Sequence, residues 1–420
     1  ELNADDYAYA GFPNGIEQGT TFGKFLGRQT RHFCADIGFD YIWFSNGFGF
    51  GLETWGVCGA IFDGETFDYS ACGEIKDKIF RFWADFRAEL PDMPIETRGT
   101  NLSTGMDLAS DAVPLREIYD KVPGISPPVN SPWAALNGDF GVEIAGWMSH
   151  IAEIPENSGY PYRFYTHDPW FINSPWLDRY GRNPHDIYMP LAITRIDAAG
   201  RVIGPDKVNF LTIDDSYGNM PDQVPDEVIP HIKRALRCAP DTAGPVIWLY
   251  PFDEYHDMTF SGNGIEEVFF GDWYFSTAIN TGFQVNTVVS TRNFKAAMDS
   301  SLLGGNIVVA PTAAAADKKV FAQLSEFIRN GGKVLFYGPV KDPDLLDLLG
   351  LELTTSIAGE LQMDIGGESV PVMHIPLYSA GGIDTVAAAT TSTSSAAATN
   401  MPMLFCAAWS AGSEEATPLQ

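Results

Sequence analysis

The chain has 420 residues, of which 45% are hydrophobic, so it is long enough for a large core and for two or more domains. It carries 26 Lys and Arg against 54 Asp and Glu, a formal net charge of -28. This balance argues against nucleic acid and anionic membranes as partners, because both bind basic patches. Neutral and cationic small substrates stay open.

The cysteines are odd in number and widely spaced, and no CxxC pattern occurs. They therefore indicate neither a disulfide framework nor a zinc site. No run approaches about 18 apolar residues, so no membrane-spanning helix is expected. The sequence opens without a signal-type leader, which leaves cytoplasmic, periplasmic and secreted locations undecided.

From about residue 22 to 278, strand-like runs alternate with amphipathic helices, which is typical of a parallel sheet built from βαβ units. Helices are predicted over 24–37 and 74–90, and a third near Asp226, whose carboxylate is expected to cap it. Strands near residues 41, 94, 162, 208 and 246 each end in carboxylates, aromatics or amides. Polar clusters at strand ends favour a (β/α)8 barrel of the TIM type.

Counted back from a second domain, these five strands would be the fourth to the eighth of the barrel. Only residues 1–20 precede the helix in front of the fourth, which is too little for three βα units. The barrel is therefore expected to be N-terminally incomplete or irregular. Long connections at 114–160 and 171–207 are expected to help build a substrate site.

A second unit is predicted from strands at 285–290, 306–311 and 331–339 and a helix at 317–330, capped by Asp317 and ended by Gly331. This order favours a small, doubly wound, flavodoxin-like α/β domain. It lacks a GxGxxG or P-loop motif, so no nucleotide cofactor is expected. The predicted domains are a barrel at 1–281, the flavodoxin-like domain at 282–350, and a β-rich or partly disordered segment at 351–420.

A barrel followed by such a domain and a β-rich piece resembles the family 42 glycoside hydrolases, the β-galactosidases with a trimerisation domain. The runs 306–311 and 331–339 are similar to the second domain of that family. The resemblance covers roughly residues 22–351. It implies a glycosidase acting on a carbohydrate substrate, and it favours a homo-oligomer.

The family pattern implies an acid/base Glu after an Asn at the fourth strand and a nucleophilic Glu at the seventh. Here Asn46 is followed by Gly47, and the nearest acid is Glu53. At the seventh strand the acids are Asp214 and Asp215. These departures favour a distant relative with a rebuilt site.

Cleavage of a glycosidic bond in an oligo- or polysaccharide needs two carboxyl groups, about 5 Å apart for retention and roughly 6.5–9.5 Å apart for inversion. Burial beside aromatics or other carboxylates can keep one of them protonated. Strand alternation allows only one of two adjacent acids to face the barrel mouth, unless the strand has already ended. The catalytic candidates are Glu53, Glu254, Asp168, Asp214 and Asp215.

Each candidate has a structural alternative, such as an ion pair for Glu254 or local turn hydrogen bonds for Asp168. Tryptophan and tyrosine rings can stack on the apolar faces of sugars, although core packing is the commoner fate of a single Trp. The predicted substrate contacts are Trp43, Asn46, Trp55, Arg98, Asn101, His167, Trp170, Trp176, Asp253 and Tyr255.

Two other functions stay open. A metal-dependent hydrolase would use the pairs His167–Asp168, His185–Asp186 and His256–Asp257, but no HExxH or similarly tight spacing supports a metal site. A non-catalytic carbohydrate-binding protein is the other alternative. No metal and no cofactor are predicted.

Overall fold

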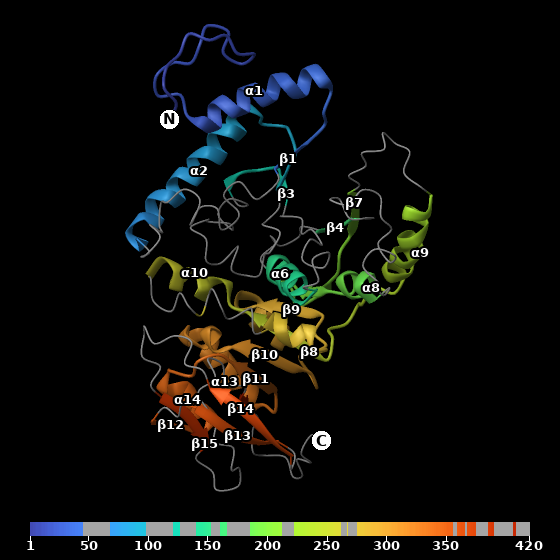
Figure 1. Ribbon diagram of the computed structural model, residues 1–420, viewed down its shortest axis with the longest axis vertical. Helices are drawn as coiled ribbons and strands as arrows, with labels where there is room; N and C mark the ends of the chain where they lie inside the picture. The colour runs from blue at the N-terminus through green and yellow to red at the C-terminus, as the bar shows by residue number, and fades with distance from the viewer. Residues whose placement is uncertain are drawn as a thin grey trace. The chain divides into compact units, whose positions relative to one another are not determined.

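The computed structural model describes residues 1–44, 68–97, 121–126, 140–152, 160–165, 185–211, 222–261, 267, 275–355, 359–365, 368–374, 385–389 and 406–408 (Figure 1). Contacts divide the chain into two compact units. Unit 1 comprises residues 1–195, 203–241 and 255–283, and unit 2 comprises 196–202, 242–254 and 284–420.

Unit 1 begins with a pair of packed helices, α1 (Phe22–Ile37) and α2 (Cys72–Glu89). The Thr21 hydroxyl accepts from the Lys24 N–H at 3.2 Å to cap α1, and Gly38 ends that helix with φ of 82°. Gly23 faces α2 so closely that a Cβ there would lie 2.4 Å from the Phe82 carbonyl oxygen. Both predicted helices are confirmed. Because Gly23 has no side chain, the two helices can pack this closely.

The strands of unit 1 are short and parallel. β1 (Ile42–Phe44), β2 (Ile95–Thr97) and β3 (Ile125–Ser126) pair in that order, and β4 (Pro161–Tyr165) pairs with β7 (Lys207–Leu211). Helices α6 (Phe140–Ala152), α8 (His185–Leu191) and α9 (Gln223–Arg237) lie between or after them in the chain. The βαβ alternation is confirmed, and closure into a barrel stays a prediction.

The predicted cap of α9 is wrong. The helix begins at Gln223, so Asp226 lies in its first turn, and Asp222 at the N-cap makes no side-chain capping hydrogen bond. The prediction started the helix after Pro225. Proline is tolerated in the first turn, where its missing N–H has no helical partner, so the helix can begin earlier.

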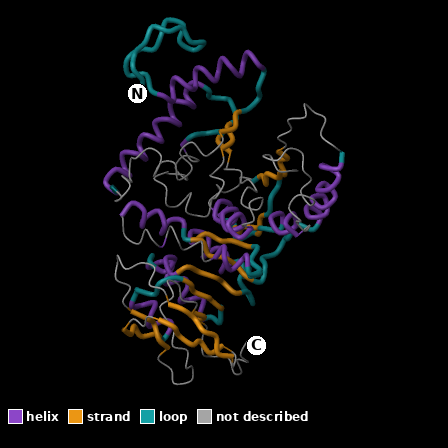
Figure 2. The backbone as a smooth tube through the Cα atoms, in the orientation of Figure 1, coloured by secondary structure: helices purple, strands orange, loops and turns teal. Residues whose placement is uncertain are grey.

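A seven-stranded sheet is mixed and mostly parallel, with strand order β16-β11-β10-β8-β9-β5-β6. Figure 2 draws the described strands in orange. The strands of this sheet are β5 (Thr194–Ile196), β6 (Val202–Ile203), β8 (Val246–Tyr250), β9 (Thr287–Ser290), β10 (Ile307–Pro311), β11 (Lys333–Tyr337) and β16 (Cys406–Ala408). Of these pairs, β11 with β16 is antiparallel.

β8 had been predicted as the last strand of the barrel, and it lies instead between β10 and β9 in this sheet. The prediction chose the wrong sheet because β8 is buried on both faces. A continuous apolar run is expected of any buried parallel strand, so its sequence carries no sign of which sheet it joins.

The four central strands reverse their winding at β8. Numbered along the chain from β8, the adjacent parallel strands β9-β8-β10-β11 follow the order 2-1-3-4. The chain therefore winds to one side from β8 to β9 and to the other side from β9 to β10 and β11. The boundary between β8 and β10 is a topological switch point.

Helices α12 (Phe294–Asp299) and α13 (Lys318–Arg329) contribute Phe294, Leu324 and Phe327 to the hydrophobic core of unit 2. The Asp317 carboxylate accepts from the N–H groups of Lys319 and Val320 at 2.8 and 2.9 Å, as the sequence predicted. Gly331 follows the helix with φ of 88°.

Apart from β16, the described residues after 342 include α14 (Pro343–Leu349) and two antiparallel strand pairs. These pairs are β12 (Leu351–Thr355) with β15 (Thr385–Ala389), and β13 (Gly359–Ile365) with β14 (Glu368–His374). Across the described ranges, no helix combines the length and the apolar character that crossing a bilayer requires.

Candidate functional site

The carboxyl end of β8 leads directly into helix α10 (Phe252–Ser261), whose first turn carries Asp253 and Glu254. Strand alternation had been expected to separate these two acids. The strand has already ended at Tyr250, so helical geometry applies to them instead. Glu254 is buried with 7% of its surface exposed, whereas Asp253 is half-exposed.

Glu254 contacts Thr291, which follows β9. The Thr291 hydroxyl donates to Glu254 Oε2 at 2.9 Å. The parallel register pairs Tyr250 with Ser290, so the two strand ends lie side by side and bring their next residues together. The contact is thus built by the pairing of β8 with β9.

Burial raises the pKa of Glu254 to about 7. The charges of Asp253 and Asp317 raise it further, while the hydrogen bond from Thr291 lowers it by favouring the charged form. About half of the Glu254 side chains are therefore protonated near neutral pH. A neutral carboxylic acid of this kind can both donate and accept hydrogen bonds.

Asp253 has a different environment. It forms an ion pair with Arg292, with Nη2 and Oδ1 3.2 Å apart, and both side chains are substantially exposed to solvent. Such a pair contributes roughly 0–1 kcal/mol to stability. The two adjacent carboxyl groups therefore differ: Glu254 is buried and has a raised pKa, whereas Asp253 is half-exposed and paired with Arg292.

Thr312 adds a buried polar group at the end of β10. It is 7% exposed, and its hydroxyl has no hydrogen-bond partner among the described residues. The hydroxyl faces Gly338, where an added Cβ would lie 2.7 Å from Oγ1. Ligands of open α/β sheets bind outside the carboxyl ends of strands at a switch point, which is where Glu254 and Thr312 lie.

Sequence reasoning missed Thr291 and Thr312. Each is the first residue after an apolar run, at the carboxyl end of β9 and of β10. Their position directly after a strand is the feature of the sequence that could have identified them as candidate site residues. Their relation to Glu254 depends on which strands are neighbours, and that is set by contacts between distant parts of the chain.

Unit 1 offers a second arrangement at the ends of β4 and β7. The parallel register pairs Tyr165 with Leu211. In the sequence, Asp168 comes three residues after Tyr165, and Asp214 comes three residues after Leu211. Trp43 lies in β1, where its backbone pairs with that of Glu96 in β2.

Of the predicted site residues, the structure describes side-chain surroundings for Asp253, Glu254 and Tyr255. Tyr255 is 1% exposed, which leaves no open ring face for a sugar. The candidates that lie outside the described residues are Asn46, Glu53, Trp55, Arg98, Asn101, His167, Asp168, Trp170, Trp176, Asp214 and Asp215.

The His-Asp pairs of the metal alternative lie in different segments of the chain. His185–Asp186 belongs to α8 and His256–Asp257 to α10, while His167–Asp168 lies outside the described residues. Within the part of the chain that the structure describes, no group of three or more His, Cys, Asp or Glu side chains is arranged to hold a metal ion.

No family model and no curated protein matches the chain. Solved structures similar to it include the cold-adapted β-galactosidase from Rahnella sp. R3, at 16% identity and a TM-score of 0.41, covering 72% of this chain and 48% of that one. Gan42B, a GH42 β-galactosidase, is similar at 13% identity and a TM-score of 0.44, over 76% and 49%.

A catalytic mutant of Gan42B from G. stearothermophilus gives 13% identity and a TM-score of 0.43, over 76% of this chain and 49% of that one. The chain therefore spans about half the length of these solved structures. The resemblance to family 42 β-galactosidases expected from the order of elements is also found between the structures, with TM-scores below 0.5.

Proposed function

We propose that the protein is a glycoside hydrolase whose carboxylate pair is Asp168 and Asp214. The observation that supports the pair is the parallel register of β4 and β7, which aligns Tyr165 with Leu211. Both acids follow that aligned position by three residues. Neighbouring strands lie about 4.8 Å apart, close to the roughly 5 Å that separates the two carboxyl groups of retaining glycosidases.

In this proposal, one carboxylic acid protonates the leaving oxygen while the other carboxylate attacks the anomeric carbon. Water then hydrolyses the glycosyl-enzyme, and the first residue takes back a proton as base. We assign Asp168 as the acid because Pro169 and Trp170 follow it, and apolar neighbours disfavour a carboxylate. Asp214 is then the nucleophile.

Glu254 has a separate role in this account. Its residue range belongs to unit 2, and the carboxylates that influence it there are Asp253 and Asp317. The strand order β9-β8-β10-β11 supports a flavodoxin-like domain that begins at β8, earlier than residue 282. Glu254 is therefore proposed as a structural acid of that domain, and the barrel is proposed for unit 1.

Kinetics of single variants test the pair. Asp168→Asn and Asp214→Asn should each lower kcat on aryl glycosides and oligosaccharides by about 100-fold or more, with sugar binding retained. Asp215→Asn is the matched control and should keep most activity. Full turnover in both variants would overturn the assignment, and sugar binding without any turnover by the unaltered chain would support a non-catalytic protein.

A further inference from the structure

A depression of about 330 Å³ opens on unit 1 beside the end of α1 and the segment that joins α2 to β2. Its volume is at the lower end of small-ligand sites, about 300–1,000 Å³. Its polar lining consists of Arg31, Asp40, Glu89 and Asp92. None of these residues belongs to the proposed catalytic pair.

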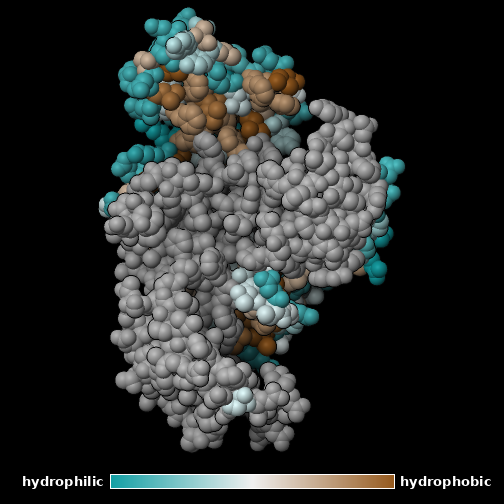
Figure 3. Space-filling view, viewed as in Figure 1, coloured by the Kyte–Doolittle hydropathy of each residue, from teal (hydrophilic) through white to brown (hydrophobic). Residues whose placement is uncertain are grey.

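Phe39 gives the depression an exposed aromatic wall. Phe39 is 50% exposed, and the centroid of its ring lies 5.7 Å from the ring centroid of Phe33, which is also exposed. Figure 3 shows hydrophobic side chains gathered on the surface over the N-terminal helices. Exposed aromatic rings that lie together mark binding surfaces more often than scattered single residues do.

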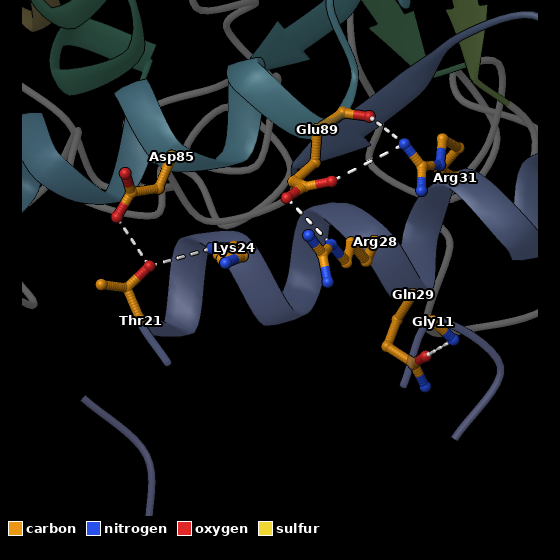
Figure 4. Close-up of polar contacts among 8 residues, drawn as sticks. All are labelled: Gly11, Thr21, Lys24, Arg28, Gln29, Arg31, Asp85 and Glu89. Carbon is orange, nitrogen blue, oxygen red and sulfur yellow. Dashed lines mark hydrogen bonds and ion pairs between the residues drawn. The ribbon is translucent and has the colours of Figure 1, made fainter. Parts of the chain in front are cut away.

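The charge of Glu89 is already compensated within the protein (Figure 4). Arg28 Nε lies 2.9 Å from Glu89 Oε1, and Arg31 Nη1 lies 3.6 Å from Oε2. Arg31 Nη1 also donates to the Glu89 carbonyl oxygen at 3.5 Å. The guanidinium of Arg31 is thus held at the edge of the depression.

Asp40 and Asp92 are exposed, and the charge of Asp92 interacts with that of the buried Arg87. Their carboxylates can accept hydrogen bonds from a ligand. They disfavour an anion, whereas Arg31 beside them is already paired with Glu89. A neutral ligand that carries many hydroxyl groups can donate hydrogen bonds to both carboxylates.

The wall from Leu90 to Pro94 is held in place by hydrogen bonds from Arg87 and Ile42. The buried Arg87 donates through Nη1 to the carbonyl oxygens of Leu90 and Met93, at 2.8 and 2.5 Å. The Ile42 N–H donates to the Pro94 carbonyl at 3.0 Å, which ties the wall to β1. A wall that is ordered before binding reduces the entropic cost of binding.

We propose that this depression is a secondary carbohydrate-binding site for a neutral oligosaccharide. The Phe39 ring stacks on the apolar face of one sugar, while Asp40 and Asp92 accept from its hydroxyl groups and Arg31 donates to them. The choice of ligand class rests on the proposed function. A broad protein contact is disfavoured, because a stable interface needs about 800 Å² of each partner rather than one small depression.

Titration calorimetry with neutral oligosaccharides tests the site, using the chain with Asp168→Asn and Asp214→Asn so that the ligand stays intact. Phe39→Ala should weaken binding at this secondary site about tenfold and leave binding at the carboxylate pair unchanged, and Phe39→Trp should preserve both. Asp40→Asn with Asp92→Asn should weaken it several-fold. Tyr7→Ala is the matched control, because Tyr7 is 74% exposed in the N-terminal segment outside the depression.

Two results would overturn the site. One is oligosaccharide binding that Phe39→Ala leaves unchanged, or no binding at all. The other is Phe39-dependent binding of spermidine in place of the sugars, which would indicate a cation site. Circular dichroism of each variant checks that it has folded.

The proposed sugar site and the proposed hydrolase function can be rejected independently of each other. Phe39→Ala in the otherwise unaltered chain should leave hydrolysis of a small aryl glycoside unchanged. Phe39-dependent sugar binding in a chain that hydrolyses no glycoside would sustain the site and reject the function. Hydrolysis that depends on Asp168 and Asp214, without Phe39-dependent binding, would do the reverse.

Discussion

Thr291 donates a hydrogen bond to the buried carboxyl group of Glu254 across 2.9 Å, where β8 and β9 end side by side. The donor favours the charged form of an acid whose burial favours the neutral form. The balance between these two effects gives Glu254 its pKa of about 7, so the stability of the protein should depend on pH near neutrality.

The stability of the protein should depend on the protonation of Glu254. Its pKa is raised in the folded chain, so the stabilisation is complete below the unfolded value of about 4.3 and is lost as pH rises through about 7. The loss is on the order of 3 kcal/mol at most. Glu254→Gln should abolish this slope, measured as denaturation midpoints at about pH 5 and about pH 8.

Asp253→Asn is the control for that experiment, because Asp253 is partly exposed and paired with Arg292. It removes a neighbouring negative charge, so it should shift the slope slightly and leave it in place. An identical pH slope in Glu254→Gln and the unaltered protein would show that another group governs it.

Thr291→Val should raise the pKa of Glu254 further, because it removes the hydrogen bond that favours the carboxylate. It should also lower stability by about 1–2 kcal/mol above neutral pH. Thr291→Ser retains the hydroxyl and should restore both values. Infrared titration of the protonated carboxyl band, with Glu254→Gln as the blank, measures the pKa directly.

Thr312→Val should have the opposite effect on stability. The Thr312 hydroxyl is buried and has no hydrogen-bond partner in the described ranges, so the isosteric valine removes a desolvation penalty. We expect a gain of about 1 kcal/mol in the free energy of unfolding. A loss comparable to that of Thr291→Val would mean that the Thr312 hydroxyl does bind a partner, such as an ordered water molecule.

Gly23→Ala should separate α1 from α2, because the new Cβ would lie 2.4 Å from the Phe82 carbonyl oxygen. We expect a loss of about 1–3 kcal/mol, measured by thermal denaturation. Gly73→Ala, in α2, is the matched control, since a Cβ there meets nothing within 4 Å. It should be neutral or stabilising by up to about 1 kcal/mol.

The parts of the fold that depend on local sequence were predicted well. Asp317 caps α13 and Gly331 follows its end as expected, because capping and left-handed glycine are properties of a few consecutive residues. The strand at 246–250 was also found, but its sheet was not. Membership of a sheet depends on pairing with residues 287–290 and 307–311, which no local pattern encodes.

The same distinction holds for the candidate site. The sequence predicted that burial would keep one of the candidate carboxyl groups protonated, and burial does raise the pKa of Glu254. Its donor, Thr291, lies 37 residues away in the sequence, directly after β9, so it emerged only from the register of β8 and β9. The proposal that Asp168 and Asp214 form a pair likewise depends on the register of β4 and β7, which aligns Tyr165 with Leu211.

The assignment of Asp214 as nucleophile is tested most directly by trapping. A fluorinated glycoside of the sugar that the chain hydrolyses should leave a stable glycosyl-enzyme, and mass spectrometry of its peptides should find the label on Asp214. Asp168→Asn should slow the release of that label, and Asp214→Asn should prevent labelling. A label on another residue, or hydrolysis that proceeds without any labelled intermediate, would contradict the proposed retaining pair.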